Sequence, residues 1–529
     1  MSRTEAFGPG QWATPRTWLP PVVAIAVGSF LLRLVFSGMV WPVPLVEDEA
    51  RYWDWSRYPD WSYHTKGPLV AWLIDLSTAL VGETELGVRL PAYLCAGGSV
   101  FFSGVAGAMM SRGHRLVAIW SAIGFEAILG TQFSGFVMTI DAPMLTCWTG
   151  SFAMALWAWR RLEQGRSPIG PAIAFGVLVA LGLLAKFTIG LAALGMLLAF
   201  SGVRARRNPQ RDGADRPGFR AGAALSAAIG ISLLGLVPVV IWNSQHDWAT
   251  FRHVLGHLDL GEGSERRSWS PMWTVGYFGL VIGVAGPFAG LSLAAGVLRW
   301  WRSPNPVVWI SLGAAAPVFV VYLVASFSTE IEGNWIVGGY VPLIPLGAEW
   351  LLRGCSSHRR WILPALRFRF LVTTVLLLSA PLLARAVPVV GGLFGQDWGS
   401  PLRRVESNQS FAVEVEMLVR DRFGEQAATI PVVANYYSRT ALLAFYGAGK
   451  PQVRCASNAI SLRSSSYDDF PHRALPDSTI EGQRVVLVGG EARLWRGTFA
   501  LREFELLGFA RQRDRDRPVY TAIYSGMLD

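Results

Sequence analysis

Charged residues are scarce in this chain of 529 residues. They make up 16% of it, while hydrophobic residues make up 52%; an average soluble domain has about 25% charged residues. This balance excludes an ordinary soluble domain and indicates a chain that crosses a membrane several times. The net charge of +10 comes from arginines that gather in loops between apolar runs, which is typical of membrane proteins and argues against a nucleic-acid partner.

Cysteine is also rare, with residues at positions 95, 147, 355 and 455. With so few cysteines and no CxxC spacing, neither a disulfide framework nor a zinc knuckle is indicated. The sequence has no Walker-type phosphate loop, no GxSxG elbow and no HExxH motif, so cytoplasmic use of ATP or a sugar nucleotide is unsupported. His253 and His257 have the spacing of two ligands on one helical face, but without a third ligand nearby an ordinary surface helix is the favoured interpretation.

Apolar runs of about 17 to 25 residues, the length that crosses about 30 Å of hydrocarbon, are abundant. The first run has no small-residue cleavage site, so it is interpreted as a retained span. We expect an all-α polytopic membrane domain over residues 1–390. Its transmembrane helices, about eleven in number, are expected at roughly 21–40, 86–110, 115–133, 140–159, 170–187, 188–203, 221–242, 271–298, 306–327, 334–352 and 370–390.

Arginines mark one side of this domain. They lie in alternate loops, around residues 112–115, 160–166, 204–220, 299–302 and 353–369, and the positive-inside rule makes that side cytoplasmic. The N-terminus is then cytoplasmic, and an odd number of spans puts the C-terminal region on the other side. We therefore expect a multi-pass protein of the plasma membrane, which in a bacterium is the inner membrane, with an extracytoplasmic C-terminal region.

The C-terminal region, residues 391–529, has a different pattern. Its apolar runs shorten to strand length at 430–434 and 484–488, and a helix-like segment lies at 438–446. The stretch 456–480, rich in Ser, Asp and Pro, is expected to be a loop. These features predict a small α/β domain.

The loop after the first span, residues 41–85, carries the most informative motif. Glu47, Asp48 and Glu49 lie at the expected edge of the bilayer, where acidic side chains are costly unless they have a function. Lys66 follows in the same loop and is a cation suited to a phosphate. Aromatic residues crowd the segment 52–63 and are expected at the headgroup level. The plain alternative is an interfacial aromatic belt with solvated acids.

Other polar residues near the expected outer face have two interpretations each. Asp141 is either a site carboxylate or a residue that stabilises a helix N-terminus. Lys186 and Arg89 either bind phosphate or extend to the lipid headgroups. Glu330, with its neighbour Glu332, is either a late contribution to the site or a solvated loop acid.

At these residues the chain resembles the polyprenyl-phosphate-dependent glycosyltransferases of the GT-C fold, in the branch of the protein O-mannosyltransferases and the lipid A aminoarabinose transferases. The matching segments span residues 1–350, and they are Asp48–Tyr52, Lys66–Leu69 with Trp72–Leu73, Gly87–Pro91, Asp141–Pro143, Gly182–Thr188, Trp242–His246 and Asn334–Trp335. One departure is Thr65, where some aminoarabinose transferases have an acid before the lysine. It puts in doubt any metal site borrowed from them, and aminoarabinose as the sugar.

The resemblance implies a membrane enzyme that moves a sugar from a polyprenyl-phosphate carrier to an extracytoplasmic lipid, glycan or protein. We hypothesise an inverting displacement with catalytic roles for Asp48, Glu49 and Asp141. The donor phosphate would be bound by Lys66, Lys186 and Arg89. No cofactor is required, although the acids permit a divalent metal. Further candidates for substrate binding are Arg51, Tyr52, Tyr63, His64, Glu330 and Asn334.

Two other classes of protein remain open at this point. A transporter or flippase for a lipid-linked or anionic solute would use the same charges to line a pathway, but such proteins often have two related halves with broken helices, and the sequence shows no such symmetry. A membrane assembly factor without catalysis would not need Asp48, Lys66 and Asp141 together.

Overall fold

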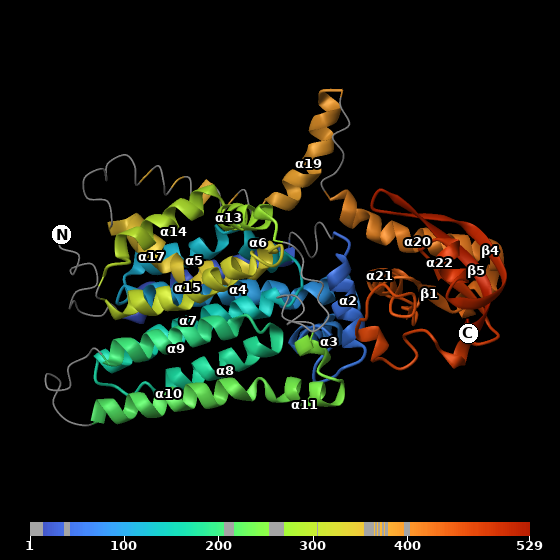
Figure 1. Cartoon of the computed structure of the whole chain (residues 1–529). Coiled ribbons are helices and arrows are strands. Elements are labelled where there is room, and N and C mark those ends of the chain that lie inside the picture. The colour runs from blue at the N-terminus through green and yellow to red at the C-terminus, as the bar shows by residue number, and fades with distance from the viewer. Residues whose placement is uncertain are drawn as a thin grey trace. The chain divides into compact units, whose positions relative to one another are not determined.

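The computed structural model describes residues 14–35, 43–205, 216–252, 269–303, 305–353, 379–395 and 402–528, with isolated residues between 364 and 375. The chain divides into two compact units (Figure 1). We call the first the helical unit; it comprises Met1–Phe36, Lys66–Leu69 and Leu90–Ala380. The second, the mixed unit, comprises Ser37–Thr65, Val70–Arg89 and Pro381–Asp529.

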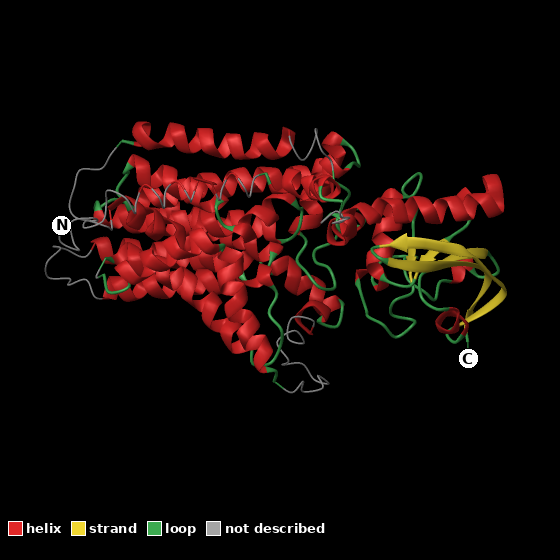
Figure 2. Cartoon of the chain, turned by 90° about the horizontal axis from the view of Figure 1, so that it is seen from above, coloured by secondary structure: helices red, strands yellow, loops and turns green. Residues whose placement is uncertain are grey.

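The helical unit is a bundle whose helices run side by side (Figure 2). Its elements are α1 (Pro15–Arg33), α4 (Glu85–Met110, whose first turn belongs to the mixed unit), α5 (Arg115–Glu126), α6 (Leu129–Phe136), α7 (Asp141–Glu163), α8 (Ile169–Ala185), α9 (Ile189–Ala205), α10 (Arg216–Leu234), α11 (Val237–Gln245), α13 (Pro271–Ala285), α14 (Pro287–Trp300), α15 (Pro306–Ala325), α16 (Gly333–Tyr340), η4 (Val341–Leu343) and α17 (Ile344–Arg353).

The structure confirms a polytopic membrane protein. Within the residues it describes, five helical stretches are long and apolar enough to cross a membrane, or six if the bent pair α5 and α6 is one span. They are Pro15–Arg33, Glu85–Met110, Ala221–Gln245, Pro306–Ala325 and Gly333–Leu352. The figure of eleven spans stays a prediction, since several expected spans are shorter or interrupted helices and much of 370–390 lies outside the described residues.

Two expected spans are broken for local reasons. The expected span at 115–133 bends by 69° between α5 and α6. The expected span at 271–298 is interrupted at Gly286, whose φ of 76° is left-handed, and Pro287 then starts α14. Glycine adopts this conformation readily, and proline is favoured in the first turn of a helix. Apolar composition alone therefore overestimated the continuity of these helices.

A buried polar cluster lies at the bend between α5 and α6. The Arg33 guanidinium forms an ion pair with Glu126, with 2.9 Å between Nη2 and Oε2, and also donates to Gln132 Oε1 at 2.9 Å. Ser29 Oγ donates to Glu126 Oε1 at 2.5 Å. A buried charge persists only when it is paired and hydrogen-bonded, so this cluster ties α1 to the turn that leads into α6.

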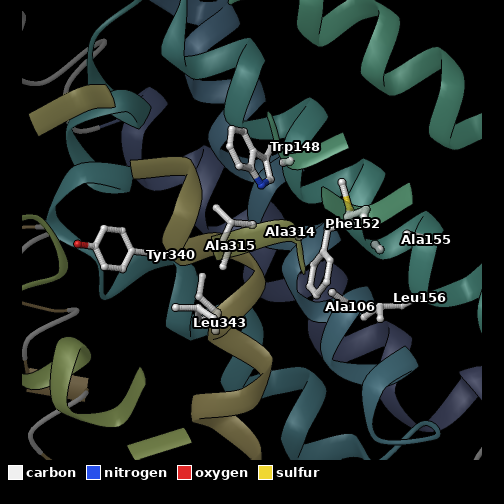
Figure 3. Close-up of a cluster of buried hydrophobic side chains, with 14 of the residues drawn as sticks. Ala106, Trp148, Phe152, Ala155, Leu156, Ala314, Ala315, Tyr340 and Leu343 are labelled. Atoms are coloured by element: carbon white, nitrogen blue, oxygen red, sulfur yellow. The ribbon is translucent and has the colours of Figure 1, made fainter. Parts of the chain in front are cut away.

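Small residues allow the helices of this unit to approach closely. A Cβ atom at Gly195 of α9 would lie 1.9 Å from the carbonyl oxygen of Gly313 in α15, a form of contact common between membrane helices. Between α7 and α15, the core is filled by larger groups: Trp148 and Phe152 face the region of Ala314 and Ala315 (Figure 3). Both aromatic side chains are fully buried.

The mixed unit contains a five-stranded sheet with strand order β2-β1-β3-β5-β4. The strands are β1 (Val432–Ala434), β2 (Arg454–Cys455), β3 (Arg484–Val488), β4 (Phe499–Gln512) and β5 (Arg515–Met527); the first three are parallel, and β5 is antiparallel to β3 and β4. The helices are α2 (Glu47–Ser56), α3 (Leu69–Val81), α19 (Ala380–Leu393), α20 (Arg403–Phe423), α21 (Tyr437–Tyr446) and α22 (Ala492–Arg496); the short 3-10 turns are η5 (Gly424–Thr429), η6 (Ser466–Asp468) and η7 (Ser478–Ile480).

Most aromatic residues of the outer loop are buried inside the mixed unit, so the alternative of an interfacial aromatic belt does not describe them. Trp53 is 0% exposed and Trp55 is 1% exposed, because the C-terminal part of the chain covers them within the mixed unit. Trp53 packs edge-on against Phe445 with 4.9 Å between the ring centroids, and Tyr58 stacks on Phe470 at 4.8 Å. Trp61, at 57% exposure, is the exception.

The division of the chain also differs from the expected boundary at residue 390. The loop predicted at 41–85 was grouped with the membrane domain, whereas most of it clusters with residues 381–529. The aromatic contacts above and a buried ion pair between Asp54 and Arg473 are the physical reason. Only Lys66–Leu69 of this loop belongs to the helical unit.

Candidate functional site

Asp141, Lys186 and Asn334, three residues singled out from the sequence, meet in the helical unit. Lys186 Nζ lies 2.8 Å from Asp141 Oδ1, and Asn334 Nδ2 donates to Asp141 Oδ2 at 3.1 Å. Lys186 Nζ also donates to the backbone carbonyl of Asn334 at 3.3 Å. The lysine and aspartate side chains are 11% and 7% exposed. We call these three residues the Asp141 cluster.

Helix geometry explains how α7 and α8 bring two members together. The helices α7 and α8 pack along each other and are joined by a short connection, so the start of α7 and the end of α8 lie at the same end of the pair. Asp141 is the first residue of α7, and Lys186 caps the C-terminus of α8. Each charge therefore has the sign that its helix end favours.

The third member is positioned by the packing of α16 on α7. Asn334 and Gly338 are one turn apart on α16, and a Cβ atom at Gly338 would lie 2.6 Å from the ring of Trp148. Trp148 lies two turns after Asp141 on α7, so the face of α7 that carries it also carries Asp141. Glycine at 338 thus allows α16 to approach closely enough for the amide of Asn334 to reach Asp141.

Asp141 does not act as a helix cap, and Lys186 does not extend alone toward lipid headgroups. The N-cap of α7 is Ile140, and no side-chain cap bond is formed there; the Asp141 carboxylate instead accepts from Lys186 and Asn334. Lys186 does not simply extend to headgroups, because it is paired with that carboxylate. The geometry therefore places a partly buried ammonium group and a carboxylate side by side.

Lys66 reaches the same region of the helical unit through its neighbour Gly67. A Cβ atom at Gly67 would lie 2.2 Å from the carbonyl oxygen of Leu184 and 2.8 Å from its carbonyl carbon. Leu184 is two residues before Lys186, so the backbone beside Lys66 is in direct contact with the end of α8. Lys66 itself is half-buried. Two lysines from distant parts of the sequence are thereby anchored to the same helix end.

The acids of the outer loop have different environments, although all three lie in the first turn of α2. The Asp48 side chain is 54% exposed and pairs with Arg51, with 2.9 Å between Oδ1 and Nη2. Glu49 is fully buried, and its carboxylate accepts from Arg89 Nε at 2.8 Å and Nη2 at 2.6 Å. Glu47 pairs with Arg513. Among the three, Asp48 is therefore the carboxylate best exposed to a substrate.

Arg89 has a different partner from the phosphate that the sequence suggested. Besides Glu49, it donates from Nη1 to the carbonyl of Val43 at 2.5 Å and from Nη2 to that of Pro44 at 2.9 Å. These bonds hold the start of the outer loop against the first turn of α4. The ion pair between Glu49 and Arg89 therefore stabilises the conformation of this loop, and neither side chain faces solvent.

The candidates for substrate binding in the loop also differ in their burial and in their contacts. Tyr63 is 1% exposed, and its hydroxyl donates to the carbonyls of Trp55 and Tyr58 at 3.1 and 3.0 Å; burial raises its pKa above the ordinary value. Its role is structural, contrary to the expectation. Tyr52 is 2% exposed and lies beside Arg51, whose Nη2 donates to its hydroxyl at 3.3 Å. His64 is half-buried, with Nδ1 3.6 Å from Asp469 Oδ2.

Arg51 stays cationic in this environment. Burial by itself would lower the pKa of its guanidinium, but Tyr52, Asp48 and Tyr437 outweigh this effect and raise it. The guanidinium also lies over the rings of Tyr52, Trp55 and Tyr437, at 5.1 to 5.3 Å from their centroids. Its position is therefore fixed by aromatic packing as well as by the bond to Asp48.

The remaining predicted residues lie away from these contacts. Glu330 is exposed in the loop before α16, and the hydrogen bonds of the described residues do not join it to the Asp141 cluster. His253 and His257 lie outside the described residues. Within the part of the chain that is described, no group of three or more His, Cys, Asp or Glu side chains is arranged to hold a metal ion.

Sequence reasoning missed the contribution of the C-terminal residues to the neighbourhood of the acidic motif. Tyr437 and Arg463 approach Arg51, and Tyr467 and Arg473 bind Asp54. No local motif marks these residues. These residues lie about 400 positions from α2 in the sequence, and periodic patterns relate only residues that are close in sequence. Only the tertiary structure therefore identifies them.

Comparisons with known proteins agree with the resemblance in the motifs. Residues 65–242, which include Lys66, Asp141 and Lys186, match the family described as dolichyl-phosphate-mannose-protein mannosyltransferase. Lipid A galacturonosyltransferase RgtD of Rhizobium johnstonii is 28% identical over 344 residues, which are 61% of this chain and 65% of that protein. An undecaprenyl phosphate-alpha-4-amino-4-deoxy-L-arabinose arabinosyl transferase of Pseudomonas fluorescens is 23% identical over 300 residues, or 54% of this chain and 51% of that one.

These alignments span between half and two thirds of the length of the relatives. Among solved structures, apo ArnT from Cupriavidus metallidurans matches with a TM-score of 0.61 at 17% identity, covering 96% of this chain and 98% of that chain. The same protein bound to undecaprenyl phosphate matches with a TM-score of 0.60. In sequence the chain is thus similar to these glycosyltransferases, and its fold is the fold of ArnT.

Proposed function

We propose that this protein is a membrane glycosyltransferase that moves a sugar from a polyprenyl-phosphate carrier to an extracytoplasmic lipid, glycan or protein. The observation that carries the proposal is the Asp141 cluster, in which a carboxylate and an ammonium group lie 2.8 Å apart at the ends of α7 and α8. Lys66 is anchored to the same helix end through Gly67. The family match over 65–242 and the relatives named as a galacturonosyltransferase and an arabinosyl transferase support the same reaction class.

The chemical step is a single inverting displacement. The acceptor hydroxyl oxygen attacks the anomeric carbon as the bond from that carbon to the phosphate oxygen breaks. Asp48 accepts the hydroxyl proton, and the polyprenyl phosphate leaves with the bonding electron pair. The exposure of the Asp48 carboxylate and its place in the first turn of α2 support this role. Glu49 is not assigned a chemical role, because it is buried in its pair with Arg89.

The lysines stabilise the departing phosphate, whose negative charge grows in the transition state. An ammonium group has three donors. For Lys186, Asp141 and the carbonyl of Asn334 account for two of them, so a third remains for a phosphate oxygen. Asp141 keeps the Lys186 ammonium group in position. Lys66 is the second phosphate ligand in this proposal. Arg89 is not a phosphate ligand, because it is paired with Glu49.

The finer topology belongs to the same proposal. About eleven spans are inferred from the lengths of the apolar runs, and a cytoplasmic N-terminus with an extracytoplasmic C-terminal region is inferred from the distribution of loop arginines. The motif-bearing loop then lies on the outer side, where the acceptors would be found. Related proteins from Rhizobium and Pseudomonas support a bacterial inner membrane. Labelling of single cysteines placed at exposed positions of β4 with a membrane-impermeant reagent, in intact spheroplasts, tests this orientation.

Transfer itself is tested with the purified full-length protein in nanodiscs. A polyprenyl phosphate carrying a radiolabelled sugar is supplied with lipid, glycan and peptide acceptors. We expect the label to move to one acceptor class and polyprenyl phosphate to be released in equal amount. A flippase would instead relocate the labelled lipid between leaflets of a vesicle without moving label to any acceptor, and that result would refute the enzyme proposal.

Replacement of Gly67 by alanine is expected to lower kcat/KM by about 10²-fold, because a displacement of about 1 Å at a catalytic group can cost that much. The new Cβ atom would meet backbone atoms of Leu184, which cannot rotate away. The loop that carries Lys66 must therefore shift. Steady-state transfer kinetics measure the effect. Gly170→Ala on α8 is the matched control, since nothing lies within 4 Å of its Cβ position; equal losses in both variants would contradict the assignment.

A further inference from the structure

The mixed unit contains a small pocket next to the acidic motif. Arg51 and Trp55 of α2 line one side, and Thr65, Tyr437, Arg463 and Ser466 are among the other residues around it. Its volume is about 10 Å³, which is roughly the space that one water-sized group occupies. The pocket can therefore take the oxygen end of a functional group, and the rest of such a molecule would remain outside.

Two arginines give this pocket a positive character. The Arg51 and Arg463 guanidinium carbons lie 5.1 and 5.8 Å from the centroid of the Tyr437 ring. Tyr437 adds no negative charge at neutral pH, because burial together with its hydrogen bond to Tyr436 raises its pKa to about 12. None of the described residues that line the pocket is an acid. Asp48 lies next to it as the ion-pair partner of Arg51.

Several buried polar atoms at the pocket have no partner among the described residues. Thr65 is 7% exposed and Ser466 is 2% exposed, and neither the Oγ1 atom of the first nor the Oγ atom of the second makes a hydrogen bond. The Nε atom of Arg51 is also buried without an acceptor. A buried donor without a partner costs about 1–3 kcal/mol. Donors gathered in this way are what a bound oxyanion would satisfy.

We propose that this pocket binds an oxyanion of one of the two substrates, a carboxylate or a phosphate, and so selects for an anionic substrate. Arg51 and Arg463 supply the charge, and the hydroxyl groups of Thr65 and Ser466 supply neutral donors. The proposal rests on the transferase function proposed above. The oxyanion has two sources, the carboxylate of a transferred uronic acid or a phosphate of the acceptor, and both have the fork-like geometry that arginine matches.

Thr65 fits this assignment better than an acid would. A carboxylate at this position would place a negative charge in the pocket and repel a bound oxyanion. A hydroxyl group contributes a donor instead.

Binding without turnover tests the proposal directly. The full-length protein in nanodiscs, without acceptor, is titrated with polyprenyl-phosphate galacturonate and with its neutral analogue, polyprenyl-phosphate galactose. In a second arm, without donor, it is titrated with a phosphorylated acceptor lipid and its dephosphorylated form. We expect the anionic member of one pair to bind about tenfold to a hundredfold more tightly, the range of a charged hydrogen bond. The arm that shows this preference identifies the source of the oxyanion.

The substitution Arg463→Gln is the main variant, because this side chain is exposed and its loss should not disturb folding. We expect it to remove most of the preference for the anionic ligand and to leave the neutral ligand unchanged, with an increase in KM and little change in kcat. Arg463→Lys should restore part of the preference. Arg502→Gln, at another exposed arginine of the mixed unit, is the matched control and should have no effect.

The outcomes separate this proposal from the function on which it rests. Transfer to an acceptor together with equal binding of the anionic and neutral ligands in both arms would refute the pocket and leave the transferase intact. A preference in binding that Arg463→Gln abolishes, with no transfer to any acceptor, would support the pocket and refute the transferase. A preference that Arg463→Gln leaves unchanged would place the selectivity elsewhere and overturn the proposal.

Discussion

Asp48→Asn is expected to lower kcat for sugar transfer by about 10²- to 10⁴-fold, the usual contribution of a general base. Asparagine has nearly the same shape but cannot accept the acceptor proton at neutral pH. Because the Asp48 side chain is 54% exposed, its replacement should leave the fold unchanged. Binding of the polyprenyl-phosphate donor should change little, since the lysines that hold the phosphate remain. Single-turnover transfer and equilibrium donor binding together measure the two effects.

The neighbouring acids provide controls for this prediction. Glu47→Gln removes a carboxylate from the same first turn of α2, where it pairs with Arg513, and should retain nearly native kcat. Glu49→Gln breaks the buried pair with Arg89, so it should reduce the amount of folded protein more than the rate per folded molecule. A transfer rate at the native level in purified Asp48→Asn would remove Asp48 from the mechanism.

Arg473→Met is expected to destabilise the mixed unit by about 3–5 kcal/mol, the cost of leaving one partner of a buried ion pair without the other. Arg473 and Asp54 are both 0% exposed and form two parallel contacts, one of them 3.0 Å between Nη1 and Oδ1. Asp54 also accepts from the Tyr467 hydroxyl at 2.7 Å. Burial alone would lower the pKa of Arg473, but the attraction of Asp54 outweighs the effect of burial, so the pKa is raised. Without the arginine, the Asp54 carboxylate stays buried.

Limited proteolysis and thermal unfolding of the full-length protein measure this loss. Arg422→Met is the matched control: its pair with Glu505 has a similar distance of 3.1 Å, but both side chains are more than half exposed, so the expected change is about 0–1 kcal/mol. The double variant Asp54→Leu with Arg473→Met should be more stable than Arg473→Met alone, because no charge remains buried. A double variant less stable than the single one would show that the pair contributes more than charge neutralisation.

The stability prediction also bears on function, because α2 carries both Asp48 and Asp54. The ion pair with Arg473 and the packing of Trp53 on Phe445 hold this helix to the C-terminal part of the mixed unit. Loss of the C-terminal residues should therefore disturb the acidic motif as well as the sheet. In this sense the C-terminal region supports the candidate catalytic helix from within the same unit.

Local sequence signals predicted the elements that depend on nearby residues. The apolar run at 484–488 coincides with β3, and the helix expected at 438–446 is α21, which starts one residue earlier. The same kind of reasoning placed Asp141, Lys186 and Asn334 at one end of the bundle, because helix length and alternating direction fix which ends meet. The strands β4 and β5 and the helix α20 were not singled out, since their exposed surfaces blur the apolar pattern.

The sequence by itself thus predicted the membrane class, the reaction family suggested by the motifs and a common outer location for Asp141, Lys186 and Asn334, while the contacts among these three residues come from the tertiary structure. Only the tertiary structure decided that Asp48 is exposed while Glu49 is buried against Arg89, that the aromatic residues of α2 are covered by the C-terminal region, and that Arg463 lies near Arg51. The physical reason is the sequence separation between the residues that interact. Periodicity and helix ends are set by residues a few positions apart, whereas these pairings join segments separated by 40 to about 400 residues and depend on packing that no local pattern encodes.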